Sequence, residues 1–235
     1  MTLRESWDSH ADEWIRWVRT PGHDSYDQFH GRRFLELVPP PGRLTVDIGG
    51  GEGRLGRDLT RLGHRVVMFD GSPSLARACA SHELPLAVCV ADASFTPARS
   101  ACTDLVVAFM SLHDVDELDA TVAEIARLLV PGGSLCMAIV HPLNSAGSFE
   151  GEHDDADAPF VVRGSYLTPF RYHDEIERDG LTMTFHSIHR PLGSYTKVLQ
   201  SSGFVIEVMQ EVSDESEANR WRRLPMFLDL RARRL

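Results

Sequence analysis

The sequence predicts an α/β protein built on a mostly parallel β-sheet with helices on both faces. Strand-like and helix-like segments alternate between residues 44 and 140, which is typical of a parallel sheet. A glycine-rich turn, Gly49-Gly50-Gly51-Glu52-Gly53, directly follows the first apolar run and precedes a helical pattern. Ligands of such sheets bind outside the carboxyl ends of the strands, so residues at strand ends are the first candidates for a site.

The length of 235 residues and a hydrophobic content of 43% favour one domain over residues 1–235. We divide it into an N-terminal helical cap, a cofactor-binding core, an insertion that covers the substrate, and the last part of the sheet. These parts are residues 1–40, 41–141, 142–193 and 194–235.

The N-terminal cap is expected to be helical. Leu3, Trp7, Trp14 and Val18 recur at helical spacing and predict an amphipathic helix over residues 3–19. A second helical pattern runs from Tyr26 to Leu37. The structural interpretation of its aromatic residues is lid or core packing, and the functional one is that these helices cover a cofactor.

In the core, apolar runs predict strands and amphipathic runs predict helices, and two more strands follow a helix near the end of the chain. The predicted strands are 44–48, 65–70, 86–91, 104–109, 134–140, 204–211 and 225–230. The predicted helices are 53–62, 73–80, 116–129 and 194–201.

The glycine turn admits two interpretations. Gly51 to Gly56 reads G-x-G-x-x-G, and Asp70 follows nineteen positions after Gly51, as in a dinucleotide fingerprint. Read from Asp47, the same turn presents a strand-borne carboxylate. A pyrophosphate would lie between Asp47 and Glu52, a like-charge arrangement, whereas a sulfonium ligand with an α-amino group would be attracted. The charge pattern therefore favours S-adenosyl-L-methionine (SAM) over a nicotinamide cofactor.

Four ordered motifs carry a resemblance to a known family. They are the run from Val46 to Gly53, Asp70 after Val66-Val67-Met68-Phe69, Ala91-Asp92-Ala93, and Leu129-Val130-Pro131-Gly132-Gly133. Together they resemble class I SAM-dependent methyltransferases of the type that acts on small molecules. The resemblance implies a seven-stranded Rossmann-like sheet with an antiparallel last strand, and S-adenosyl-L-homocysteine as product.

The resemblance also implies the cofactor site. Asp70 would accept hydrogen bonds from both ribose hydroxyls, and Ser72 leaves it free by capping the next helix. Asp92 would accept from the adenine amino group beside the backbone N–H of Ala93, although a simple turn acid is the competing interpretation. Carbonyls near Phe109 and Met110 would hold the SAM amino group. The expected cofactor residues are Tyr26, Asp47, Gly49, Gly50, Gly51, Asp70, Gly71, Ser72, Asp92, Ala93, Phe109 and Met110.

Two histidines are candidate general bases. His141 directly follows the fifth strand, and Pro142 biases it towards an extended backbone, so we place it ahead of His113. The alternatives are that His141 only hydrogen-bonds the insertion and that His113 only caps a helix. The expected substrate residues are His141, Tyr166, Tyr172 and His186.

The insertion of roughly fifty residues is long enough to suggest a functional role. Its acidic run, residues 150–157, lacks calcium-loop spacing and is expected to be a solvated loop. Alternation over residues 182–185 predicts a strand that places His186 and His189 on opposite faces. No metal site is predicted.

A net charge of -10 and a pI near 5.5 argue against nucleic acid or an anionic membrane as partner. No signal peptide or membrane span is recognisable, so a cytoplasmic location is expected. We therefore expect methyl transfer to an oxygen or nitrogen of a small organic acceptor, such as a secondary metabolite, by a monomer or homodimer. The alternatives are an NAD(P)-dependent oxidoreductase that uses Gly51–Gly56 and a non-catalytic SAM-binding protein.

Overall fold

The computed structural model describes residues 1–151, 155–215 and 220–235. Within these residues the chain forms a seven-stranded sheet of order β10-β11-β5-β4-β1-β2-β3. Its strands are β1 (Thr45–Ile48), β2 (Val66–Asp70), β3 (Ala87–Val90), β4 (Thr103–Phe109), β5 (Leu129–Val140), β10 (Phe204–Val212) and β11 (Phe227–Arg234). Strands β1 to β5 run parallel, and β11 is antiparallel to both neighbours. The predicted mostly parallel sheet with an antiparallel last strand is confirmed.

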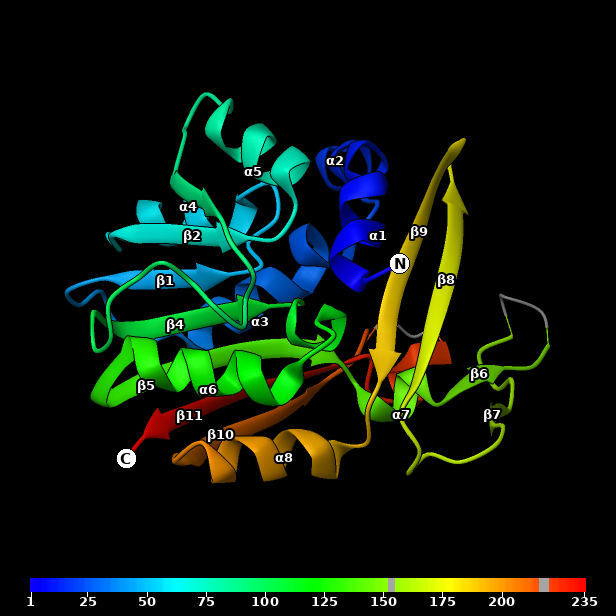
Figure 1. The fold of residues 1–235 in the computed structure, drawn as a ribbon. Coiled ribbons are helices and arrows are strands. Elements are labelled where there is room, and N and C mark those ends of the chain that lie inside the picture. The colour runs from blue at the N-terminus through cyan, green and yellow to red at the C-terminus, as the bar shows by residue number, and fades with distance from the viewer. Residues whose placement is uncertain (152–154, 216–219) are drawn as a thin grey trace.

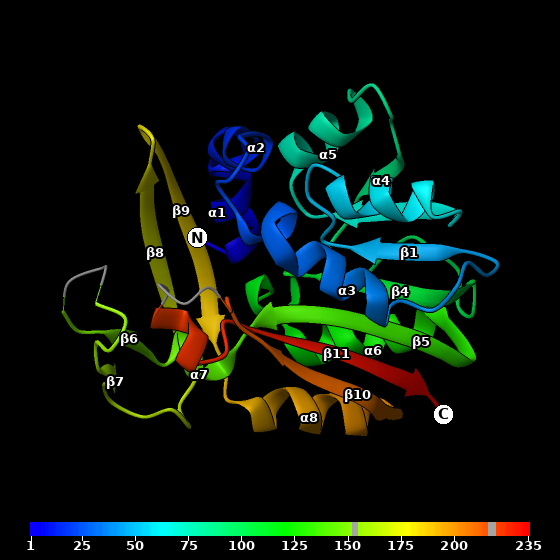
Figure 2. The same cartoon turned by 180° about the vertical axis from the view of Figure 1, so that it is seen from behind.

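Helices cover both faces of the sheet, as Figures 1 and 2 show from opposite sides. On one face lie α3 (Gly31–Leu37) and α4 (Arg54–Arg61), and on the other lie α6 (Leu118–Leu128) and α8 (Leu192–Ser201). The pattern of α6 explains its position, because Leu118, Val122 and Ile125 recur at helical spacing and are all buried against the sheet. Helix α5 (Pro73–Ala80) packs beside β2 and β3.

The N-terminal cap differs from the single helix predicted over residues 3–19. It consists of α1 (Leu3–Ser9) and α2 (Ala11–Arg19), followed by the π-helical turn η1 (Tyr26–His30). His10 ends α1 with φ -104° and ψ 12°, and its Nδ1 lies 2.8 Å from the Ser6 carbonyl oxygen. The same carbonyl also accepts the His10 backbone N–H and the Ser9 hydroxyl, so α1 closes here although the helical pattern continues in the sequence.

The insertion forms two hairpins beyond the carboxyl ends of the parallel strands (Figure 1). A short helix α7 (Pro142–Ser145) leads into β6 (Gly147–Phe149) and β7 (Phe160–Val162). The longer pair, β8 (Phe170–Arg178) and β9 (Leu181–His189), extends past α1 and α2. Met183 of β9 anchors this hairpin, because it is fully buried in a cluster with Trp17 and Val18 of α2.

Several predicted boundaries shift. The fifth strand starts at Leu129 instead of residue 134, because Leu129 pairs with Thr103 of β4 before the register shifts and Ser134 pairs with Leu105. A 3-10 turn, η2 (Leu112–Asp114), precedes α6, and another, η3 (Arg220–Arg223), precedes β11. The predicted strand near residue 182 is confirmed as β9, while residues 152–154 of the predicted acidic loop lie outside the described residues. None of the described helices combines the length and the apolar character needed to span a bilayer.

Candidate functional site

A cavity of about 1290 Å³ lies at the carboxyl ends of β1, β2 and β4. The glycine turn, η2, the N-terminal helices and the β8–β9 hairpin all contribute to its lining. Pockets that hold one drug-sized ligand measure about 300–1,000 Å³, so this cavity has room for two small molecules side by side.

The glycine turn brings the main chain to the cavity surface. Gly49 and Gly51 have φ of +70° and +61°, in the left-handed region that side chains disfavour. A Cβ atom at Gly49 would lie 2.5 Å from the Cβ of Ser111, and one at Gly50 would lie 2.6 Å from Oδ2 of Asp47. These positions therefore need glycine for conformation or for space, and the turn leaves its backbone accessible to a ligand.

Asp47 ends up buried under this turn with no partner. Its exposed fraction is 1%, and neither carboxylate oxygen accepts a hydrogen bond from any described residue. Burial, together with the nearby Asp70, raises the pKa of this carboxyl to about 7. A buried unpaired carboxylate is costly, so a cationic ligand group beside it would be strongly favoured.

Asp70 links two loops at the end of β2. Its Oδ2 accepts the Gly51 N–H and its Oδ1 accepts the Ser72 N–H, both at 2.8 Å. Each oxygen retains a lone pair, so the carboxylate can still accept from a diol. The Ser72 hydroxyl accepts the Leu75 N–H and caps α5, as the sequence suggested.

At the next strand end, Asp92 Oδ1 accepts from the N–H and the hydroxyl of Ser94. The hydrogen bonds from Ser94 lower the pKa of the Asp92 carboxyl. Asp92 is therefore ionised at neutral pH and lines the cavity beside Ala93.

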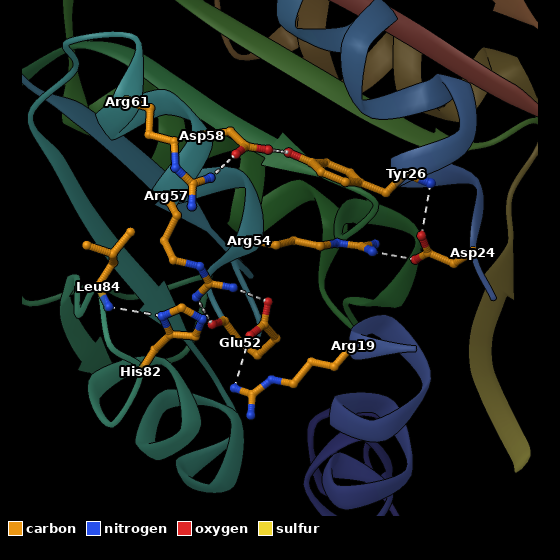
Figure 3. Close-up of polar contacts among 10 residues, drawn as sticks. All are labelled: Arg19, Asp24, Tyr26, Glu52, Arg54, Arg57, Asp58, Arg61, His82 and Leu84. Carbon is orange, nitrogen blue, oxygen red and sulfur yellow. Dashed lines mark hydrogen bonds and ion pairs between the residues drawn. The ribbon is translucent and has the colours of Figure 1, made fainter. Parts of the chain in front are cut away.

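The two acids of the glycine turn have different environments, which the charge argument from sequence did not distinguish. Glu52 forms salt bridges with Arg57 and, at 3.2 Å, with Arg19 (Figure 3). Asp47 has no such partner. The attraction for a cationic ligand at this turn therefore comes from Asp47, because the charge of Glu52 is already balanced.

A second polar group, His113 and Asp114 of η2, also lines the cavity. Nδ1 of His113 has no partner among the described residues, and burial, with Arg190 nearby, lowers its pKa to about 3. Asp114 Oδ1 accepts from the Ser187 hydroxyl at 2.6 Å. Burial raises the pKa of the Asp114 carboxyl well above its ordinary value. This acid, which we had not placed in the site from sequence, lines the cavity.

Aromatic side chains from the N-terminal helices and β9 form one wall of the cavity. The rings of Trp7 and Trp14 lie 5.6 Å apart, and Phe185 lies 6.0 Å from Trp14. Both contacts are edge-to-face, and all three residues line the cavity. Their helical spacing identified an apolar stripe, but the sequence alone did not show that this stripe faces a cavity.

Most predicted site residues meet in this cavity. Those that line it are Asp47, Gly49, Gly50, Gly51, Asp70, Gly71, Ser72, Asp92, Ala93, Phe109, Met110, His113 and Tyr172. The predicted residues that do not line it are Tyr26, His141, Tyr166 and His186.

Each of these four side chains contacts another part of the protein. The Tyr26 hydroxyl donates to Asp58 at 2.8 Å, while Arg54 lies over its ring (Figure 3). The Tyr166 hydroxyl accepts the Leu192 N–H, and the ring of His186 packs 4.9 Å from that of His10.

His141 is the N-cap of α7. Its Nδ1 accepts the Leu143 N–H at 3.0 Å, and its Nε2 lies 3.2 Å from the Glu211 carboxylate. Pro142 keeps His141 extended, as expected, but this extended backbone serves the cap and directs the ring away from the cavity.

We expect His141→Ala to affect stability rather than ligand binding. Loss of an N-cap acceptor should lower the free energy of unfolding by about 0.5–2 kcal/mol. Urea unfolding and calorimetric titration with SAM check this. A large loss of SAM affinity with unchanged stability would return His141 to the site.

The part of the chain that forms the glycine turn and the following strand ends is similar to known proteins. Residues 46–137 match the family described as a methyltransferase domain. The seven-stranded sheet is that of the Rossmann-like methyltransferase fold, which confirms the fold that the four motifs implied. The domain spans the glycine turn, Asp70, Asp92 and η2, so its match disfavours the oxidoreductase alternative.

Two curated proteins and one solved structure are similar to this chain. The chain is 31% identical over 134 residues to a ubiquinone/menaquinone biosynthesis C-methyltransferase of Acidiphilium cryptum, covering 50% of this chain and 54% of the relative. It is 28% identical over 98 residues to a mitochondrial arginine-hydroxylase of Danio rerio, covering 41% and 30%. A SAM-dependent methyltransferase from Mesorhizobium loti shares the fold, with a TM-score of 0.70, 23% identity, and coverage of 86% and 96%. The match thus spans about half of the first curated relative and less of the second.

Proposed function

We propose that this chain is a SAM-dependent methyltransferase that acts on a small organic acceptor. The observation that carries the proposal is the buried, unpartnered Asp47 beneath the glycine turn, with Asp70 and Asp92 at the next two strand ends. A ligand that carries positive charge, a diol and a purine matches this series of acceptors.

Each part of SAM has a partner in this arrangement. Asp70 accepts from the ribose hydroxyls, and Asp92 with the backbone of Ala93 meets the adenine. Asp47 and the main chain near Met110 face the positively charged methionine end. Met110 has φ of +54°, a strained conformation for a non-glycine residue, and such strain is concentrated at functional sites.

SAM, when bound, would supply a methyl group from its cationic sulfur to a nitrogen or oxygen of the acceptor, with S-adenosyl-L-homocysteine as the leaving group. The chain holds both molecules in line and limits access of water. The N-terminal cap, residues 1–40, and the insertion, residues 142–193, cover the site in this proposal.

Asp114 is a better candidate for the general base than His113. A neutral histidine with a pKa near 3 holds a proton weakly, so His113 suits hydrogen-bond acceptance. A carboxyl whose pKa burial raises takes up a proton closer to neutral pH. The proton of the nucleophile therefore passes to Asp114, and His113 orients the acceptor.

The cofactor assignment is tested with Asp70→Ala. Loss of charge-assisted hydrogen bonds, worth about 1.5–3 kcal/mol each, should lower SAM affinity at least tenfold by calorimetry. The variant should also be less stable, because Asp70 holds the N–H groups of Gly51 and Ser72.

The matched control is Glu36→Gln, which removes an exposed acid of α3 away from the cavity and should bind SAM normally. Thermal unfolding of the unaltered protein with SAM, S-adenosyl-L-homocysteine or NAD completes the test. Stabilisation by NAD but not by SAM would overturn the proposed function.

A further inference from the structure

Acidic side chains outnumber basic ones in the cavity lining. Among the described residues, twelve acids and four arginines line it. Each of these arginines already interacts with the protein: Arg4 with the Gly71 carbonyl, Arg54 with Asp24, Arg178 with the carbonyls of Gly22 and His23, and Arg220 with the ring of Phe149. Glu52 and Asp116 are paired with arginines outside the lining, and the ten acids that remain still outnumber the four arginines.

Part of this charge lies away from the proposed cofactor residues, on the β8–β9 hairpin. Tyr172, Asp174 and Ile176 alternate along β8, so they share one face, and all three line the cavity. Among the described residues Asp174 makes no hydrogen bond or salt bridge, and its one neighbouring charge is that of His173 on the same strand. Asp174 is exposed at the open side of the cavity, and the partial burial of its carboxyl raises the pKa of that group.

An independent observation points to a ligand in the same cavity. His113 is 5% exposed, lines the cavity, and leaves Nδ1 without a partner among the described residues. Its Nε2 lies 3.5 Å from Asp114. With the ring proton on Nε2, towards that carboxylate, Nδ1 is a hydrogen-bond acceptor. An N–H donor from a ligand would satisfy this buried atom.

The third observation concerns the aromatic side chains of the cavity wall. Asp174 pairs in register with Phe185, whose ring joins those of Trp7 and Trp14 in the cavity wall. Aromatic faces attract cations and stack with flat rings, and carboxylates close to them strengthen the attraction for an ammonium group.

We propose that the acceptor is an arylalkylamine, a flat ring that carries an amine protonated at neutral pH. The ring packs against the wall of Trp14 and Phe185, and the ammonium group interacts with Asp174 and donates to Nδ1 of His113. This inference rests on the proposed function and specifies its substrate class. SAM does not account for these groups, because they lie on η2 and the hairpin, whereas Asp47, Asp70 and Asp92 lie at strand ends β1 to β3.

The test uses three probes that differ only in charge. Tryptamine, indole-3-ethanol and indole-3-acetate are titrated calorimetrically into the full chain saturated with S-adenosyl-L-homocysteine. We expect tryptamine to bind at least tenfold more tightly than the alcohol, and the carboxylate to bind most weakly. Binding of tryptamine should weaken with added salt, while that of the alcohol should not.

A pair of variants locates the effect. Asp174→Asn should lower tryptamine affinity about tenfold and leave indole-3-ethanol and S-adenosyl-L-homocysteine unchanged, because a charge-assisted contact is lost. Glu36→Gln, a distant exposed acid, should change none of the three.

The outcomes separate this inference from the proposed function. If S-adenosyl-L-homocysteine fails to bind, the proposed function fails. If it binds but tryptamine shows no advantage over the alcohol, or none of the probes binds, the acceptor class is overturned. The same holds if Asp174→Asn leaves tryptamine affinity unchanged.

Discussion

Asp114→Asn is expected to lower kcat by roughly 10²–10⁴-fold, the range that general-base catalysis contributes. Asparagine keeps an oxygen that can accept from the Ser187 hydroxyl, so the contact between η2 and β9 is preserved. It removes the carboxylate that takes the proton from the nucleophile. SAM affinity should remain within about twofold, because Asp114 lies apart from the strand ends β1 to β3.

The pH dependence of turnover tests the role of Asp114 more directly than the value of kcat does. Burial raises the pKa of Asp114, so at acidic pH the carboxyl is protonated and cannot accept. Turnover of the unaltered protein, followed with methyl-labelled SAM and an amine acceptor, should therefore rise with pH through this raised pKa. The variant should lack that rise.

Asp119→Asn, in an exposed position of α6, is the matched control and should behave as the unaltered protein. Full turnover with an unchanged pH profile in Asp114→Asn would show that Asp114 serves only structure. The general base would then be sought at His113 or Tyr172.

Asp47→Asn should lower the affinity for SAM and raise the stability of the ligand-free protein at pH 8. SAM affinity should fall at least tenfold, because an unpaired carboxylate beside the cationic cofactor is lost. The ligand-free protein should become more stable at pH 8. The folded-state pKa is about 7, against an ordinary value of 3.8 for an aspartate carboxyl, so between these pH values the native state holds a proton that the unfolded chain has released.

The direction in which stability changes with pH follows from this difference in pKa between the folded and unfolded states. The Asp47 contribution to stability is complete below pH 4, falls as pH rises towards 7, and is absent above it. At about 1.36 kcal/mol per pKa unit, the amide should recover on the order of 2–4 kcal/mol at pH 8 and little at pH 4.

Urea unfolding at both pH values, with and without SAM, measures both effects, and Asp119→Asn again serves as control. Reduced stability of Asp47→Asn at pH 8, or retained SAM affinity, would contradict the assignment of Asp47 as the cation acceptor.

The sequence by itself determined the sheet and the strand-end acids of the proposed cofactor site. Apolar runs and helical periodicity are local signals, and they predicted the parallel strands, while the resemblance of the four motifs implied the antiparallel last strand. Asp47, Asp70 and Asp92 could be brought together from sequence because the carboxyl ends of neighbouring parallel strands lie at one edge of a sheet. The glycines at 49 and 51 could be recognised because their conformational requirement is local.

Only the tertiary structure decided which polar groups are available for chemistry. Asp47 and Glu52 are equivalent in sequence, yet Glu52 is paired through Arg19 of α2 and Asp47 is not. His141 caps its own helix, while Asp114 is buried by a hairpin that contributes Ser187, 73 positions away. Partners and burial of this kind arise from packing between distant segments. Because desolvation and paired charges set the pKa of a side chain, its chemical role could not be read from the chain alone.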